Sequence, residues 1–163
     1  MNGATKIWLC AAFSPVYRCG GWASVRVHQG GRSGLAGGER NTTAGRIALA
    51  GLAAALRDLP SGAVVEIQTT SPKLAVFSGV IASLGTGAQT TPPADNLDLW
   101  AQIIAASAGR RLTLVHAPGA PATPLAFAAA WADLSRDKAK ATGAFSAAIP
   151  KPNLAKGMGL ATG

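Results

Sequence analysis

The sequence predicts one domain of mixed α/β class followed by a tail, and three observations support that assignment. Three short apolar segments separated by turn residues come first, as in an antiparallel meander. Segments with a helical apolar period then alternate with two further β-rich segments. Finally, 163 residues is the size of an ordinary domain, which can bury a sizeable core without disulfides or metals.

The first part of the chain predicts three consecutive strands. Apolar or small residues fill Lys6–Phe13, Gly21–Val27 and Arg32–Gly38. Ser14-Pro15 and Gly30-Gly31 separate these segments, and both pairs are typical of turns. We therefore expect an antiparallel meander with short connections.

The next segment predicts a helix. Thr42 or Thr43 can serve as its N-cap, and Pro60 stops it. Its apolar face consists of leucines spaced i, i+3, i+7 and i+10, namely Leu49, Leu52, Leu56 and Leu59. One helix is thus expected directly after the three strands.

Two strands and two helices follow. Ala63–Thr70 has the composition of a strand, and Pro72 suits the first turn of a helix. After the glycine-containing stretch Gly85–Pro93, Asp95 begins a further helix, and Arg111–Ala117 is a fifth strand. Residues at helical spacing predict the buried faces: Leu74, Phe77 and Ile81 in the first helix, and Leu97, Trp100 and Ile104 in the second.

The last predicted helix begins at Thr123-Pro124, a cap followed by a favoured first-turn proline, and runs to about Lys140. Its predicted apolar face is Phe127, Trp131 and Leu134. After Lys140 the periodicity stops, and Ala141–Gly163 contains two prolines and four glycines. We expect residues 1–140 to form the domain and residues 141–163 to be a flexible tail, or a segment that becomes ordered only on a partner.

The charge favours an anionic partner. The chain has 15 basic and 7 acidic residues and a net charge of +8, which suits nucleic acid. No segment approaches the ~20 apolar residues needed to span a bilayer, so we expect a cytoplasmic protein without a membrane partner. Cys10 and Cys19 match no CxxC pattern and are expected to be reduced thiols. We expect no cofactor and no small-molecule substrate.

Three local sequences sharpen this picture. Gly20-Gly21-Trp22-Ala23 opens the second strand, and Thr42-Thr43 followed by Arg46 enters the first helix. Asn96-Leu97-Asp98-Leu99-Trp100 starts the third helix. In these segments and in its order of elements the chain resembles type I ribonuclease H, over roughly residues 6–140. The resemblance implies a ribonuclease H-like fold: a five-stranded mixed sheet with helices on both faces and Lys6–Phe13 beside Ala63–Thr70.

The resemblance also locates the four positions at which the family places its metal-binding carboxylates. In this chain they hold residues without a carboxylate, namely Cys10, Ala48, Thr70 and either Ala126 or Ala128. Hydrolysis in this family needs two hard cations bridged by carboxylates, so we expect no bound metal and no catalysis. A Cys10–His116 nucleophile pair is conceivable, but a buried structural cysteine is commoner.

The resemblance further implies that Thr43 helps to hold a substrate phosphate at the start of the first helix, where free amides favour an anion. Thr43 could equally be an N-cap alone. The candidate nucleic-acid-binding residues are Arg40, Thr43, Arg46, Arg110, Arg111, Lys138 and Lys140. Two functions remain open. One is non-catalytic binding of RNA, DNA or a hybrid through backbone electrostatics; the other is a scaffold or protein-interaction role, with a protein partner held through the tail.

Overall fold

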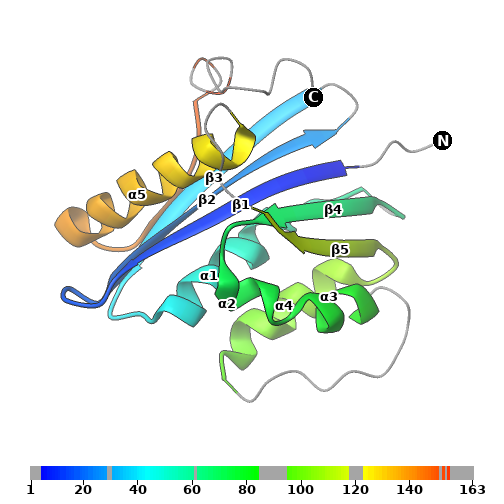
Figure 1. Ribbon diagram of the computed structural model, residues 1–163, viewed down its shortest axis with the longest axis horizontal. Coiled ribbons are helices and arrows are strands. Elements are labelled where there is room, and N and C mark those ends of the chain that lie inside the picture. Colours follow the sequence, from blue (N-terminus) through cyan, green and yellow to red (C-terminus); the bar gives the residue numbers. More distant parts are fainter. Residues whose placement is uncertain are drawn as a thin grey trace.

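The computed structural model describes residues 5–28, 31–60, 62–84, 95–117 and 123–150, together with Pro152 and Leu154. These residues form a mixed six-stranded sheet in the order β5-β4-β1-β2-β3-β6, with helices against both faces (Figure 1). The predicted α/β class is confirmed, although the sheet has one strand more than the five predicted. Gly30, the Gly85–Pro93 stretch, Lys151 and Lys156 lie outside the described residues. None of the described helices has the length and apolar character needed to cross a membrane.

The predicted meander is present. β1 (Thr5–Ser14), β2 (Cys19–His28) and β3 (Gly31–Arg40) pair antiparallel in chain order. Lys6 lies opposite Val27, which in turn lies opposite Arg32. The start of β1, the end of β2 and the start of β3 therefore share one end of the sheet.

Two parallel strands extend the sheet beyond β1. β4 (Val64–Thr69) runs parallel to β1, and β5 (Arg111–His116) runs parallel to β4. Ile7 lies opposite Ile67, so the predicted contact between the first and fourth strands is confirmed. Parallel strands end at the same edge of a sheet, and Thr70 and His116 consequently lie at the edge toward which β1 runs.

Four helices cover one face of the sheet: α1 (Ala44–Ala55), α2 (Pro72–Ala75), α3 (Ser78–Leu84) and α4 (Leu97–Ser107). α5 (Pro124–Thr142) covers β1, β2 and β3 from the other face (Figure 1). The helix predicted after Pro72 is two short helices, because the amide of Phe77 bonds to the carbonyl of Leu74, three residues back, and interrupts the α-helical pattern.

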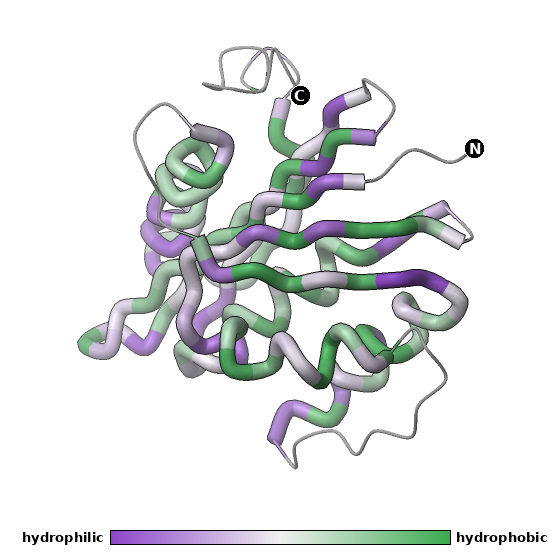
Figure 2. Tube along the Cα trace, turned by 45° about the vertical axis from the view of Figure 1, so that its right-hand side comes forward, coloured by the Kyte–Doolittle hydropathy of each residue, from purple (hydrophilic) through white to green (hydrophobic). Residues whose placement is uncertain are grey.

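Alternate residues of β1 supply the two layers of the core. Ile7 and Leu9 pack among the helices α1 to α4, whereas Trp8 and Cys10 pack against α5. Along the chain the apolar segments follow the strands and the inner sides of the helices (Figure 2). The sheet therefore separates two apolar layers.

The buried face of α4 differs from the predicted one. Leu99, Trp100 and Ile103 are buried, whereas Leu97 is 56% exposed and Ile104 is 37% exposed. The predicted and observed buried faces thus share Trp100, but the helix is turned about its own axis so that Leu99 and Ile103, rather than Leu97 and Ile104, face the core. Trp100 meets Phe77 edge-on, with the ring centroids 5.1 Å apart.

α5 packs on the sheet through small residues rather than through its predicted aromatic face. Its buried residues are Leu125, Ala128, Ala132, Ser135 and Ala139. Leu134 is 60% exposed, and Phe127 and Trp131 are half-buried. The sheet supplies the reason: a Cβ on Gly21 would lie 2.1 Å from the backbone nitrogen of Arg136, and a Cβ on Gly38 would lie 2.8 Å from the Cβ of Ala139. At this distance there is no room for aromatic rings beneath the helix.

The described residues after α5, namely 143–150, Pro152 and Leu154, include a strand of the sheet, whereas the sequence predicted a flexible tail there. β6 (Phe145–Ala148) pairs antiparallel with β3 and is the sixth strand. Ile149 and Leu154 are 3% and 2% exposed, and each has an atom 3.0 Å from the place where a Cβ on Gly34 would lie. These two side chains therefore fill the space that Gly34 leaves open on β3. A strand of only four residues, three of them small, is too short to show periodicity in the sequence.

We expect the Gly21→Ala substitution to destabilise the fold by about 2 kcal/mol or more, because the new methyl group would collide with the backbone of α5. Gly79→Ala in α3 is the matched control, since a Cβ there meets nothing within 4 Å. The control should be neutral or slightly stabilising. Urea unfolding of both variants measures the difference, and equal midpoints would show that α5 does not rest on Gly21.

We expect Ile149→Ala to cost about 2–4 kcal/mol, because it opens a cavity between β3 and the C-terminal segment. Ala147→Ser on the exposed side of β6 is the control and should leave the free energy of unfolding nearly unchanged. An unchanged thermal midpoint for Ile149→Ala would mean that residues after α5 contribute nothing to the core.

Candidate functional site

The ends of β1 and β4 and the start of α5 meet around the thiol of Cys10. The hydroxyl of Thr70 donates to Cys10 Sγ at 3.3 Å, and the thiol is 3.4 Å from the carbonyl oxygen of Leu125, to which it donates. The Cys10 side chain is 1% exposed. Two of the positions at which the resemblance places carboxylates are therefore in direct contact, and the start of the last helix lies beside them.

The other predicted positions surround this contact unequally. Ala128 packs in the same apolar cluster as Cys10, and Ala126 lies in the first turn of α5, where its amide donates to Thr123 Oγ1. Ala48 is buried on α1 in the other core layer, together with Leu9. The structure therefore brings Cys10, Thr70 and the start of α5 together, and it places Ala48 across the sheet.

The chemistry of this contact is that of neutral groups. Burial raises the pKa of the Cys10 thiol, so it is protonated at neutral pH and is a weak nucleophile. Its hydrogen-bond partners are Thr70 and Leu125, and His116 is exposed at the end of β5. The arrangement gives no support to a Cys10–His116 catalytic pair.

A groove of about 260 Å³ lies next to Thr70, between the end of β1, the start of α1 and the start of α2. Ala12, Phe13 and Ile47 give it an apolar lining, and Lys73 stands at its rim. None of its lining residues is a carboxylate. Within the described ranges, no three His, Cys, Asp or Glu side chains lie close enough to hold a metal ion. Hard cations prefer oxygen anions, which this groove lacks.

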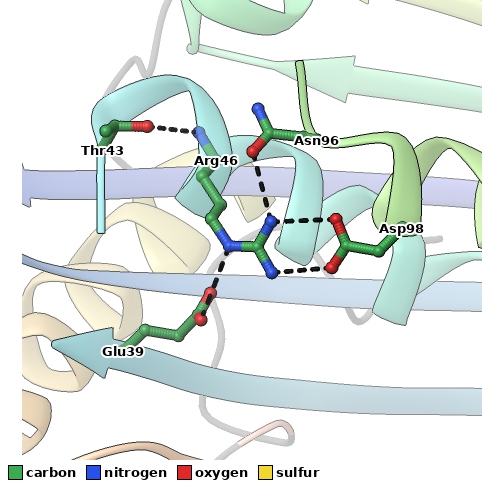
Figure 3. A network of polar contacts seen from close by, with 5 residues as sticks. All are labelled: Glu39, Thr43, Arg46, Asn96 and Asp98. Carbon is green, nitrogen blue, oxygen red and sulfur yellow. Dashed lines mark hydrogen bonds and ion pairs between the residues drawn. The ribbon is translucent and has the colours of Figure 1, made fainter. Parts of the chain in front are cut away.

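Thr43 and Arg46, at the start of α1, have structural partners. Thr43 Oγ1 caps the helix by accepting from the amide of Arg46 at 3.1 Å. The Arg46 guanidinium makes two hydrogen bonds to the carboxylate of Asp98, at 2.8 and 3.1 Å, and one to Asn96 Oδ1 at 3.2 Å. Glu39 Oε2 lies 3.9 Å from Arg46 Nε, so the end of β3, α1 and the start of α4 are joined at one side chain (Figure 3).

Two further candidate cations bind helix ends within the protein. Arg40 donates from Nε to the Ala139 carbonyl at 3.0 Å and from Nη2 to the Lys140 carbonyl, near the end of α5. Arg110 donates to the Leu59 carbonyl at 2.7 Å and to the Ala106 carbonyl at 3.0 Å. The Lys140 and Ala106 carbonyls belong to the last turns of α5 and α4, where a helix leaves carbonyls without an intrahelical partner, whereas the Ala139 carbonyl also accepts from the amide of Gly143.

The two candidate lysines contact aromatic rings. Lys138 Nζ lies 4.5 Å from the centroid of the Phe145 ring, and Lys140 Nζ lies 3.5 Å from that of Tyr17. Such cation–π contacts are favourable and hold the ammonium groups near the protein surface. Arg111 differs from the other candidates: it is exposed on β5, and no side-chain hydrogen bond or ion pair within the described residues engages it.

Some exposed cations were missed when the candidates were chosen from the sequence. Lys6, Arg18, Arg57 and Lys73 are exposed and lack a side-chain partner among the described residues, and Arg32, which is half-buried, also lacks one. They are isolated in the sequence, so clustering gave no signal. Their positions at strand and helix ends were the available indication, but only the sheet pairing shows which of them are neighbours.

Comparison with known proteins agrees with the architecture. The chain is 29% identical over 129 residues to a ribonuclease H of Acidiphilium cryptum (strain JF-5), and the match covers 76% of this chain and 80% of the relative. Among solved structures, it is similar to the N-terminal ribonuclease H domain of Rv2228c from Mycobacterium tuberculosis, which was solved as a fusion with maltose-binding protein. That match has a TM-score of 0.54 and 19% sequence identity, and it covers 85% of this chain and 96% of the other. No family model matches the sequence.

We expect Asp98→Asn to lower stability at neutral pH, and we expect this difference to disappear in acid. The Arg46 guanidinium lowers the pKa of Asp98 from 3.8 to about 2, so the native state favours the charged carboxylate. The contribution is therefore fully present above pH 4 and is lost as the pH falls toward 2.

Unfolding of wild type and Asp98→Asn across pH 2 to 7 measures this effect. Asp95→Asn is the control, because Asp95 is exposed and has no ion-pair partner among the described residues. Since the pair is exposed, the difference should also shrink in high salt. A stability difference that is constant over this pH range would contradict a role for the Asp98 charge.

Proposed function

We propose that this ribonuclease H-like protein does not hydrolyse nucleic acid but binds it, through contacts with the phosphate backbone. The proposed absence of hydrolysis rests on the contact between Thr70 and Cys10. Where two carboxylates would hold cations, a hydroxyl donates to a buried neutral thiol. Catalysis by two metal ions needs anionic oxygen ligands to fix both ions, and this pair provides none.

The acidic residues of the chain do not replace the missing ligands. Glu39 and Asp98 pair with Arg46, whereas Asp133 and Asp137 pair with Arg136. Among the remaining acids, Asp58 and Glu66 lie toward the opposite end of the sheet from Cys10, and Asp95 precedes α4. These positions support a loss of hydrolysis rather than a relocated metal centre.

Binding of nucleic acid is supported by charge and by kinship. The chain carries a net charge of +8, and the relative that it matches in sequence is named a ribonuclease H. A positive surface attracts a phosphate backbone without reading its sequence. The free buried thiols of Cys10 and Cys19 suit the reducing cytoplasm that we propose as its location.

One observation favours a protein-interaction role as the second candidate. A groove of about 270 Å³ between α5 and β6 is lined by Trp131, Phe145 and Leu134, and Leu134 is 60% exposed. Exposed apolar surface beside such a groove is typical of a partner-binding site. This role would give binding that depends little on salt, unlike contacts with phosphate.

The test uses a labelled RNA/DNA hybrid and the full-length protein. With Mg²⁺ or Mn²⁺ we expect the hybrid to stay intact, because no pair of carboxylates is available to clamp the ions. In the same buffer, fluorescence anisotropy should detect binding that weakens at least tenfold between about 50 and 200 mM salt, as counterion release requires.

Two outcomes would contradict this proposal. Cleavage that persists through purification and is lost in Thr70→Ala would show that this site is catalytic. An absence of binding to hybrid, RNA and DNA at low salt would remove the nucleic-acid role and leave the protein-interaction role. An active ribonuclease H is the positive control for cleavage.

A further inference from the structure

The lysine and arginine side chains without a hydrogen bond, ion pair or ring contact among the described residues lie mainly at one end of the sheet. Among the described residues, six lysines and arginines have no side-chain hydrogen bond, ion pair or ring contact: Lys6, Arg18, Arg32, Arg57, Lys73 and Arg111. Arg18 and Lys73 lie at the end of the sheet that contains Cys10 and Thr70. The other four lie at the opposite end, where β1, β3 and β5 begin and α1 has just ended.

Three of these four share one face of the sheet. Lys6, Trp8 and Cys10 are spaced two residues apart on β1, so their side chains lie on the same face of the sheet. Arg32 lies opposite Val27, which lies opposite Lys6. Thr113 on β5 pairs with Glu66 on β4, which pairs with Lys6, so Thr113 shares the face of Lys6. Arg111 is two residues before Thr113 and therefore lies on the same face, at the start of β5. Lys6, Arg32 and Arg111 are therefore on the face that α5 covers elsewhere, and we call them the basic row.

The spacing of the basic row follows from sheet geometry. Arg32 and Arg111 each stand two strands away from Lys6, and neighbouring strands are about 4.8 Å apart. Arg111 is also displaced by two residues along its strand, so the row extends for roughly 20 Å. It crosses the end of the sheet at which β1 and β5 begin, and these strands begin at the right-hand side of Figure 1.

The surroundings strengthen the positive potential. Arg26 and Arg110 bind backbone carbonyls at the same end and keep their charges there, and Arg57 stands beside them. The acids at this end are Asp58, near Arg26, and Glu66, which aligns with Lys6 on β4. Hydrophilic segments mark these strand ends on the side of the N-terminus (Figure 2). Six cations against two acids at one end produce a local excess of positive charge.

The surface next to the basic row suits a phosphate backbone. No described helix covers this face over β4 and β5, and α3 packs behind β5 on the other face. Gln68 and Thr113 present an amide and a hydroxyl there, between the half-exposed side chains of Val64 and Val115. Lysine and arginine side chains, together with neutral hydrogen-bonding groups, are the residues that usually contact phosphate and sugar in nucleic-acid complexes. Protein–protein interfaces, in contrast, usually centre on a buried apolar or aromatic cluster.

We propose that the basic row of Lys6, Arg32 and Arg111 binds the phosphate backbone of a nucleic-acid duplex, at the end of the sheet opposite the Cys10–Thr70 contact. This inference rests on the proposed nucleic-acid binding and adds its location. β4 alone, at about 3.3 Å per residue, separates the two ends by roughly 20 Å. The duplex is therefore held away from the former catalytic groove, and its binding does not require that groove.

The test compares two charge-reversal variants of the full-length protein. K6E/R32E/R111E removes the basic row, and R18E/K73E removes the two free cations at the other end of the sheet. Binding of a labelled duplex of about 20 base pairs is followed over a salt series. We expect the triple variant to lose at least tenfold in affinity and to reduce the slope of log K against log salt by about 3, because three phosphate contacts are lost. R18E/K73E should stay within about threefold of wild type.

Each other outcome has a defined meaning. If the triple variant keeps its affinity and slope, or if R18E/K73E loses as much, the location is wrong although nucleic-acid binding stands. If wild type binds no duplex, the proposed function fails and this inference fails with it. Binding of polyglutamate that exceeds duplex binding and is lost in the triple variant would assign the row to an acidic protein and overturn the proposal. Thermal melting checks folding, and K6Q/R32Q/R111Q replaces the triple variant should that variant unfold.

Discussion

α5 rests directly on Gly21 and Gly38 of the sheet, and this close packing positions the groups along the helix that contact β1 and β3. Gly21 and Gly38 allow the helix backbone to approach so closely that only small residues fit between them. This contact fixes the position of Leu125, whose carbonyl accepts from Cys10, and of Ala139, whose carbonyl accepts from Arg40. The Cys10–Thr70 contact is therefore held in place from the helix side by the packing of α5 on the sheet.

Arginines hold the other elements by binding charges and carbonyls within the protein. Arg46 joins α1 to the start of α4, while Arg26 binds carbonyls at the end of α1 and Arg110 binds carbonyls near the end of α4. A guanidinium group presents several donors in a fixed plane, which suits it to unpaired carbonyls at helix ends. Much of the positive charge of the chain thus stabilises the fold, and this explains why a list of basic residues is a poor map of a binding surface.

The two ends of the sheet are built from different residues, so a change at one end need not affect the other. Cys10 and Thr70 need only pack and satisfy each other, so their region tolerates the absence of carboxylates. The basic row depends on where β1, β3 and β5 begin and not on the groove. The proposed binding surface is therefore independent of whether the groove beside Thr70 can hydrolyse a substrate.

Local pattern and residue type were enough to predict the α/β class, five strands in their order along the chain, a helix cap at Thr123 and another at Thr42 or Thr43, of which the structure has Thr43. The family resemblance located Cys10, Ala48 and Thr70 as positions without a carboxylate. The buried faces of α4 and α5 and the packing of residues 145–149 were not predicted. For α5 and residues 145–149 the reason is that Ser135, Ala139 and Ile149 are buried against Gly21, Gly38 and Gly34, which lie far away in the sequence. Which lysine and arginine side chains bind partners within the protein, and which have none among the described residues, follows only from the three-dimensional arrangement. Lys6, Arg32 and Arg111 are far apart in the chain, and strand pairing places them on one face at the same end of the sheet.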